Sequence, residues 1–313
     1  MVCRDRRTVS LAKMTGKLND RTDAAAPPRG GVLSVPVDRF TPERRTPGTD
    51  RVAVEAPLEV LLHHPAFGQE PASFGATMRT PGDDEALAAG LLFGEGVVNA
   101  PGDLEAIETS TRRPNVVNVR LTTALAVDAQ PAARRFSAGA ACGVCGTTGL
   151  DAAIARAAAS RIAPTAPVAL AALLGLPPRM REAQSRFGDT GGIHAAALFD
   201  RDGALLDVAE DVGRHNAFDK LVGRAWLGGR LPLADRIVLL SGRASFELVQ
   251  KALRAGVSIL AAIGAPSSLA VHLAESTGLT LVGFLRERHC NVYAHPERLR
   301  EPALPSAATP VGR

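Results

Sequence analysis

Two cysteines, Cys142 and Cys145, are the strongest candidates for covalent chemistry in this chain. They form a C-x-x-C pair, and the glycines at 139, 143, 146 and 149 allow close backbone packing that leaves the sulfurs unshielded. We expect a helix from Leu150 to Ile162, capped by Thr147 or Thr148. The positive end of that helix would point back at both sulfurs, which favours a nucleophilic thiolate.

A C-x-x-C pair is also found in zinc sites and in redox disulfides. Zinc needs about four ligands, and without a second C-x-x-C or an H-x₃₋₅-H motif they would have to come from His63, His64, His289 or Cys290. A deaminase-type zinc site needs an H-x-E or C-x-E element and a proline before the first cysteine; the element is missing and residue 141 is Ala. A thioredoxin-like pair would follow the first strand of a βαβ unit, whereas this pair follows a predicted loop. Reactive thiol chemistry is therefore the preferred hypothesis, and no metal is expected.

A second group of polar side chains occupies two neighbouring stretches, Gly188–His194 and Ala209–Lys220. Their density in Glu, Asp, Arg, His, Asn and Lys between a strand and an apparent helix suggests a site. Arg214 and His215 stand at the start of that helix and favour contact with an anion. His194 fits either the site or the core, and Asp219 and Lys220 fit either the site or a helix surface.

A third group lies at the ends of predicted strands in the last third of the chain. Apolar strands at 236–240, 257–263 and 279–285 alternate with helices at 245–254 and 267–277, a βαβαβ pattern typical of a parallel sheet covered on both faces. Ligands of such sheets bind outside the carboxyl ends of the strands. These ends carry Ser241, Gly242, Arg243, Ala244 and Ser245, then the stretch 264–268, then Phe284, Leu285, Arg286, Glu287, Arg288 and His289. Hydroxyls, glycines, arginines and free helix N–H groups suggest a phosphorylated or nucleotide-bearing ligand.

The remaining elements are expected upstream of this unit. Short strands are predicted at 52–55 and 58–62, a helix from Asp83 through Leu92, and a strand at 115–121. Segments 193–199 and 204–208 flank Asp202-Gly203, which predicts a hairpin and therefore a mixed sheet.

The composition separates the chain into a basic start and a neutral body. Residues 1–50 hold ten Lys/Arg against six Asp/Glu and few large apolar side chains, so we expect a disordered basic tail, or a misassigned start codon. The other residues hold 26 of each sign, since the whole chain has 36 and 32, which argues against a nucleic-acid partner. No apolar run is long enough for a membrane helix, and no export signal is visible. Four unevenly spaced cysteines favour a reducing, cytoplasmic compartment.

Five motifs in order resemble the FdhD family, the accessory sulfurtransferases of molybdenum-dependent formate dehydrogenase. They cover about residues 51–299 and read Cys142-Gly143-Val144-Cys145-Gly146, Thr190-Gly191-Gly192-Ile193-His194, Glu210-Asp211-Val212-Gly213-Arg214-His215-Asn216-Ala217, Ser241-Gly242-Arg243, and Asn291-Val292-Tyr293 before His295-Pro296. The resemblance implies a family-like catalytic region at 51–300, with a flexible tail at 301–313. It also implies a cytidine-deaminase-like α/β fold, a mixed sheet flanked by helices with a C-terminal βαβαβ unit, and a homodimer.

The resemblance further implies a reaction. Sulfur would pass from a cysteine desulfurase, as a persulfide on Cys142 with Cys145 assisting or accepting sulfur, to the molybdenum bis-guanine-dinucleotide cofactor before that cofactor enters apo formate dehydrogenase. The segment Phe284–His289 matches the family's cofactor-binding stretch, and His194, Arg214, His215 and Ser241–Arg243 would complete the site. Two other hypotheses remain: a chaperone that binds and delivers the cofactor without covalent transfer, and a zinc-stabilised nucleotide-binding module.

Overall fold

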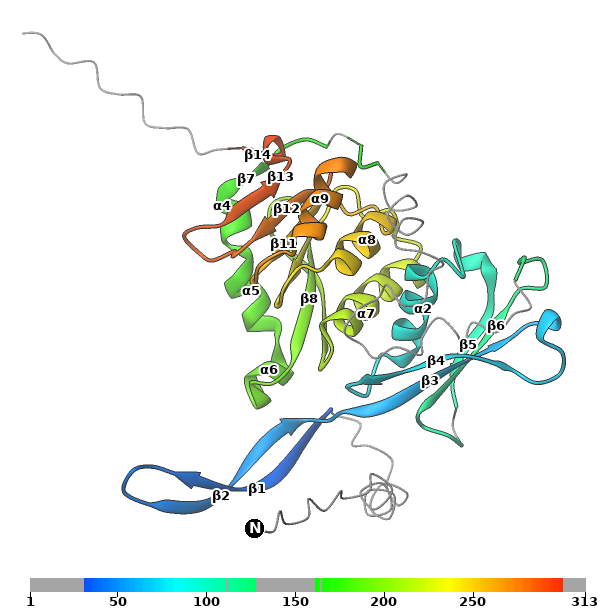
Figure 1. Ribbon diagram of the computed structural model, residues 1–313, viewed down its shortest axis with the longest axis horizontal. Helices are drawn as coiled ribbons and strands as arrows, with labels where there is room; N and C mark the ends of the chain where they lie inside the picture. The colour runs from blue at the N-terminus through cyan, green and yellow to red at the C-terminus, as the bar shows by residue number, and fades with distance from the viewer. Residues whose placement is uncertain (1–30, 111, 128–160, 164, 301–313) are drawn as a thin grey trace, which may run out of the picture.

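The computed structural model describes residues 31–110, 112–127, 161–163 and 165–300. Its centre is a six-stranded mixed sheet with the strand order β13-β12-β11-β10-β8-β9 (Figure 1). The strands β10, β11 and β12 run parallel, while β8, β9 and β13 pair antiparallel with their neighbours. Their bounds are β8 His194–Phe199, β9 Leu205–Asp211, β10 Ile237–Leu240, β11 Ile259–Ala262, β12 Thr280–Gly283 and β13 Asn291–Ala294.

Helices cover both faces of this sheet, as the uninterrupted apolar strands require (Figure 1). In β10, Val238 and Leu240 face one apolar cluster and Ile237 and Leu239 face the other. The first cluster includes α7 (Arg214–Leu227), α8 (Phe246–Arg254) and α9 (Ser268–Thr277). The second includes α4 (Leu170–Leu174) and α5 (Leu176–Ala183), and α6 (Ser185–Thr190) follows α5 directly. A short parallel pair, β7 (Val168–Ala169) with β14 (Leu299–Arg300), lies outside the main sheet.

A smaller sheet packs beside the main body together with one helix, α2 (Asp84–Gly94). Its strand order is β4-β3-β6-β5, with bounds β3 Ala56–His63, β4 Ala72–Arg79, β5 Leu104–Thr109 and β6 Val116–Leu121. The helices α2 and α7 cross at two glycines. A Cβ on Gly90 would lie 1.9 Å from the carbonyl oxygen of Asp219, and a Cβ on Gly223 would lie 1.8 Å from that of Ala86. Only glycine allows the two backbones to approach this closely.

A β-hairpin, β1 (Val32–Phe40) with β2 (Arg45–Ala53), extends from the body below α6 (Figure 1). The expectation of a disordered tail up to residue 50 is therefore wrong for residues 31–50. Val54 N closes the base of the hairpin by donating to Gly31 O, and Arg51 holds that base to the body by pairing with Asp189 at the end of α6. Residues 1–30 and 301–313, where tails were also predicted, lie outside the described residues.

Most predicted elements are confirmed. The βαβαβ unit is present, and the Ser267 side chain caps α9 by accepting a hydrogen bond from Ala270 N. The hairpin at Asp202-Gly203 joins β8 and β9, α2 begins at the predicted acidic residues, and the predicted strands at 58–62 and 115–121 correspond to β3 and β6. The helix predicted at 150–162 lies almost entirely outside the described residues. None of the helices in the described segments is long and apolar enough to span a bilayer.

Candidate functional site

The loops after β10, β11 and β12 lie against one another at the carboxyl edge of the main sheet. Gly264 N donates to Gly242 O at 2.9 Å, and Phe284 N donates to Gly264 O at 3.1 Å. Ser267 N donates to Ala244 O at 3.0 Å in the same row. The predicted convergence of three strand ends is therefore present, and we call residues 241–245, 264–268 and 284–289 the strand-end edge.

His194 joins this edge because β8 runs antiparallel to β10, so that the start of β8 lies beside the end of β10. Its Nδ1 lies 3.4 Å from Ser241 Oγ, which also accepts a hydrogen bond from Ala195 N at 2.8 Å. Burial lowers the pKa of His194, and the positive charge of Arg214 lowers it further against an opposing contribution from Asp211. His194 is therefore a neutral hydrogen-bonding group at neutral pH.

Arg214 and His215 open α7, as predicted, beside the same edge. His215 Nε2 lies 3.2 Å from Ser245 Oγ and 3.4 Å from Glu247 Oε2. Burial lowers the pKa of His215 to about 4; Glu247 opposes this shift, while Lys251, Arg214 and His194 add to it. Because both histidines are neutral, the positive charge near this edge comes from arginines. Arg214 has a buried Nε without a partner among the described residues, and Arg243 is exposed.

The segment Phe284–His289 forms a tight turn at the end of β12. Arg286 N donates to His289 O at 2.9 Å, and Arg286 Nη1 donates to the carbonyls of Ile263 at 2.7 Å and Leu285 at 2.8 Å. Phe284 has a left-handed backbone, with φ at 51°, and its ring is 40% exposed. A non-glycine residue in this region is strained, and such strain is common at functional sites. Leu285 is buried, while the other side chains of the segment are exposed: Arg286, Glu287, Arg288 and His289.

The polar stretch 209–220 divides into two parts. Asp219 and Lys220 are not helix surface, as one of the two interpretations had it, because both are buried in ion pairs. Lys220 Nζ lies 2.7 Å from Asp211 Oδ2 and donates to Thr80 O, while Asp219 accepts from Lys251 Nζ at 2.7 and 2.9 Å. These residues hold α7 against its neighbours, and only its first turn reaches the strand-end edge.

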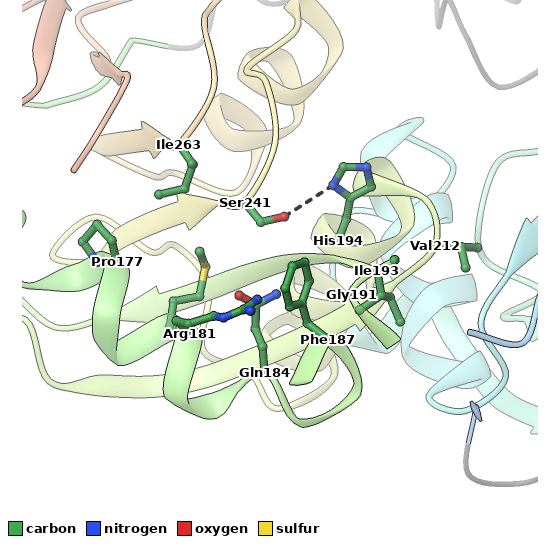
Figure 2. A pocket seen from close by; sticks show the side chains of 12 residues that line it. Pro177, Arg181, Gln184, Phe187, Gly191, Ile193, His194, Val212, Ser241 and Ile263 are labelled. Carbon is green, nitrogen blue, oxygen red and sulfur yellow. Dashed lines mark hydrogen bonds between the residues drawn. The ribbon is translucent and has the colours of Figure 1, made fainter. Parts of the chain in front are cut away.

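A cavity of about 570 Å³ opens between α5, α6 and the strand-end edge (Figure 2). His194 and Ser241 form one side, which places two predicted site residues in its wall. The opposite side includes three residues that the sequence analysis did not single out, the polar Arg181 and Gln184 and the aromatic Phe187. The carboxylate of Glu210 fixes this wall because it accepts from Arg186 N at 3.0 Å and Phe187 N at 2.9 Å. The sequence contains one sign that Arg181, Gln184 and Phe187 lie on the same side of the cavity, which is that they are spaced three residues apart.

A model of the FdhD/NarQ family matches residues 53–300 of the chain. The protein belongs to the FdhD/NarQ family. It is 48% identical over 267 residues to the sulfur carrier protein FdhD of Streptomyces avermitilis, covering 83% of this chain and 91% of that protein. It is 40% identical over 251 residues to the protein of the same name from Saccharolobus solfataricus, covering 80% of this chain and 91% of that protein. The predicted family is therefore confirmed.

The fold is shared with the crystal structure of a candidate formate dehydrogenase accessory protein from Desulfotalea psychrophila. The TM-score is 0.66 at 24% sequence identity, and the match covers 86% of this chain and 99% of that one. This similarity confirms the predicted fold class.

Two of the predicted reactive residues of this FdhD/NarQ chain, Cys142 and Cys145, lie outside the described residues. Of the other thiol and imidazole candidates, burial raises the pKa of Cys290, which favours its protonated form. His63 Nε2 lies 3.0 Å from Asn118 Oδ1, and His64 Nδ1 accepts from Ala66 N. Both histidines lie at the end of β3 in the smaller sheet, whereas the cavity and the strand-end edge belong to the main sheet.

Proposed function

We propose that this protein is a sulfurtransferase. It takes sulfur from a cysteine desulfurase as a persulfide on Cys142 and passes it to the molybdenum bis-guanine-dinucleotide cofactor that formate dehydrogenase requires. The observation that carries the proposal is the Cys142/Cys145 pair in a chain 48% identical over 267 residues to a protein named as a sulfur carrier. The protein would act in the cytoplasm as a homodimer and would deliver the cofactor to the apo-dehydrogenase.

Sulfur loading requires one thiolate and no external oxidant. The Cys142 thiolate attacks the terminal sulfur of the desulfurase persulfide, a new S–S bond forms at Cys142, and the desulfurase thiolate leaves as the old S–S bond breaks. Cys145 is three residues away, close enough in sequence to assist the transfer or to accept the sulfur.

The strand-end edge supports the second half of the proposal, in which the cofactor is bound as cargo. Arg214 and Arg243 supply positive charge for its pyrophosphates, and neutral His194 and Ser241 supply hydrogen bonds. The exposed ring of Phe284 offers an apolar surface beside them.

The test is mass spectrometry of the intact protein after incubation with a cysteine desulfurase and cysteine. We expect one added sulfur on Cys142 in the wild type and none in Cys142→Ala, which should also lose formate dehydrogenase maturation while staying folded. The matched control is Cys290→Ala, which should load sulfur normally because Cys290 is half-buried in the main body. Full sulfur loading and full maturation by Cys142→Ala would refute the persulfide role.

A second candidate is a chaperone that binds and delivers the cofactor without covalent transfer. The large cavity beside the strand-end edge favours it, because binding requires no thiol. In that case Cys142→Ala would support maturation, whereas substitutions at the strand-end edge would abolish it.

A further inference from the structure

Two pairs of polar side chains join α7 to α8, which cover the same face of the main sheet (Figure 1). In the outer pair, at the start of both helices, His215 Nε2 lies 3.4 Å from Glu247 Oε2. In the inner pair, Lys251 Nζ donates to the two oxygens of Asp219 at 2.9 and 2.7 Å. Each helix contributes one member to each pair, at positions one turn apart, so the inner pair supports the outer one.

Glu247 is held as a carboxylate by this arrangement. Lys251 Nζ lies 3.4 Å from Glu247 Oε1 and so connects the two pairs. Burial disfavours the charged form of Lys251, yet Asp219 and Glu247 outweigh it and raise the pKa of Lys251. Burial also opposes the charge of Glu247, and Lys251 outweighs it and lowers the pKa of that carboxyl. The Glu247 oxygen beside His215 is therefore an acceptor and carries no proton to donate.

The carboxylate decides which ring nitrogen of His215 carries the proton. The imidazole is neutral at pH 7, since burial lowers its pKa to about 4, so one nitrogen is a donor and the other an acceptor. Ser245 Oγ lies 3.2 Å from Nε2 and permits either arrangement, because a hydroxyl both donates and accepts. The Glu247 carboxylate attracts Nε2–H and repels a lone pair at that position. The proton therefore lies on Nε2, and Nδ1 keeps its lone pair.

This tautomer supplies a type of group that the arginines of the strand-end edge lack. Arg214 and Arg243 are donors only, which suits pyrophosphate oxygens but not a hydroxyl or an N–H group. His215 Nδ1 has no hydrogen-bond partner among the described residues, and the side chain is 16% exposed at the first turn of α7. The imidazole lone pair is therefore an acceptor available beside the arginines.

We propose that Glu247 is a positioning residue that sets the tautomer of His215, so that His215 Nδ1 accepts a hydrogen bond from a hydroxyl or N–H group of the bound cargo. The inference rests on the proposed function and deepens it, because it says how His215 holds that cargo. Glu247 acts through the imidazole, and Lys251 with Asp219 keeps Glu247 charged.

The first measurement is the tautomer of His215 in the full chain at pH 7. A long-range ¹H–¹⁵N correlation spectrum of protein with ¹⁵N-labelled histidine distinguishes a ring nitrogen that carries a proton from one that does not, and His215→Gln assigns the signal. Glu247→Gln keeps the size and removes the charge, whereas Ser245→Ala removes the hydroxyl and keeps the carboxylate. Glu275→Gln is the matched control, because Glu275 is an exposed glutamate on α9. A thermal melt of each variant checks folding.

We expect the wild type, Ser245→Ala and Glu275→Gln to carry the proton on Nε2 in about tenfold excess or more, and Glu247→Gln to lose that excess. A structural role alone would not move the proton between the nitrogens. A wild type with the proton on Nδ1 would overturn the inference even if no variant folded. Retention of the excess in folded Glu247→Gln would overturn it too, as would its loss in Ser245→Ala.

The second measurement is isothermal titration of the same proteins with GDP and with inorganic pyrophosphate, which lacks ribose hydroxyls and base N–H groups. Glu247→Gln should lose about threefold to tenfold in GDP affinity, with pyrophosphate affinity unchanged. An equal loss for both probes would assign the effect to the arginines and overturn the role of Nδ1. Unchanged GDP affinity in a variant that has lost the tautomer would overturn that role and leave the proposed function standing. A wild type that binds neither probe would count against both.

Discussion

Acidification from pH 8 to pH 5 is expected to lower the free energy of unfolding of the wild type. In His215→Gln that decrease should be about 2 kcal/mol smaller. Burial is the largest cause of the low pKa of His215, about 4 against an ordinary 6.5, and Glu247 only partly opposes it. The charged groups facing the imidazole are Glu247 and Lys251 on α8, Arg214 on α7, and His194 on β8 when it is protonated.

The direction of the effect follows from the order of the two pKa values. Between pH 4 and 6.5 the unfolded chain binds a proton at His215 that the folded chain does not, so stability rises with pH in this window. Above pH 6.5 both states are neutral and His215 adds no pH dependence. A pH of 5 is about 1.5 units below the pKa of His215 in the unfolded chain. At about 1.36 kcal/mol per unit, protonation of the unfolded chain therefore lowers the free energy of unfolding by about 2 kcal/mol. The penalty grows to about 3 kcal/mol at pH 4.

The assay is urea denaturation at one protein concentration at pH 8 and at pH 5. The difference in the free energy of unfolding between the two pH values should be about 2 kcal/mol smaller in His215→Gln than in the wild type. His272→Gln is the control, since His272 is exposed on α9 and its replacement should keep the wild-type difference. Equal differences in His215→Gln and the wild type would refute the claim that His215 is held neutral.

Two further substitutions test the packing that positions the site. Gly223→Ala should destabilise the fold by about 3 kcal/mol, because the new Cβ would lie 1.8 Å from the Ala86 carbonyl; Gly102→Ala, with open space around it, is the control in the same urea titration. A cost near zero at Gly223 would contradict the close crossing of α2 and α7. Lys251→Met should cost about 3–5 kcal/mol, because it leaves the Asp219 carboxylate buried without its partner. Adding Asp219→Asn should recover part of that loss in a double-mutant cycle, and purely additive losses would contradict the pairing.

The main sheet could be predicted because its signals are local. Four-residue apolar strands separated by amphipathic helices specify a βαβαβ unit without reference to distant residues. The hairpin β1–β2 could not be predicted in this way. Its strands carry prolines and charges, and its base is held by the contact of Arg51 with Asp189, two residues far apart in the chain. Local patterns of composition do not show such a long-range contact, so they favoured disorder where the chain forms a regular hairpin.

The candidate site was predicted in part, since polar density in the sequence does not distinguish a ligand site from a buried network. The stretch 209–220 contains both. Asp219 and Lys220 follow the first turn of α7 and lie inward, where each finds a buried partner of opposite charge. Arg214 and His215 occupy the first turn and reach the strand-end edge. The position along the helix separates these roles, because the first turn lies at the strand-end edge and the next turn is buried, and the orientation of the helix is set by the crossing with α2 at Gly90 and Gly223.

The cavity wall was missed because its residues carry no dense polar signal, yet a residue of the polar stretch explains how the wall is held. Glu210 was grouped with the site, and its carboxylate instead accepts two backbone N–H groups at the start of α6. This places Phe187 where its ring can contact the guanidinium of Arg181, next to Gln184, whose Nε2 has no hydrogen-bond partner among the described residues. Glu210 therefore acts on the cavity through the backbone rather than by contact with a ligand. A substitution there would displace the wall that carries both donors, so loss of ligand binding in a Glu210 variant would be evidence about positioning and not about contact.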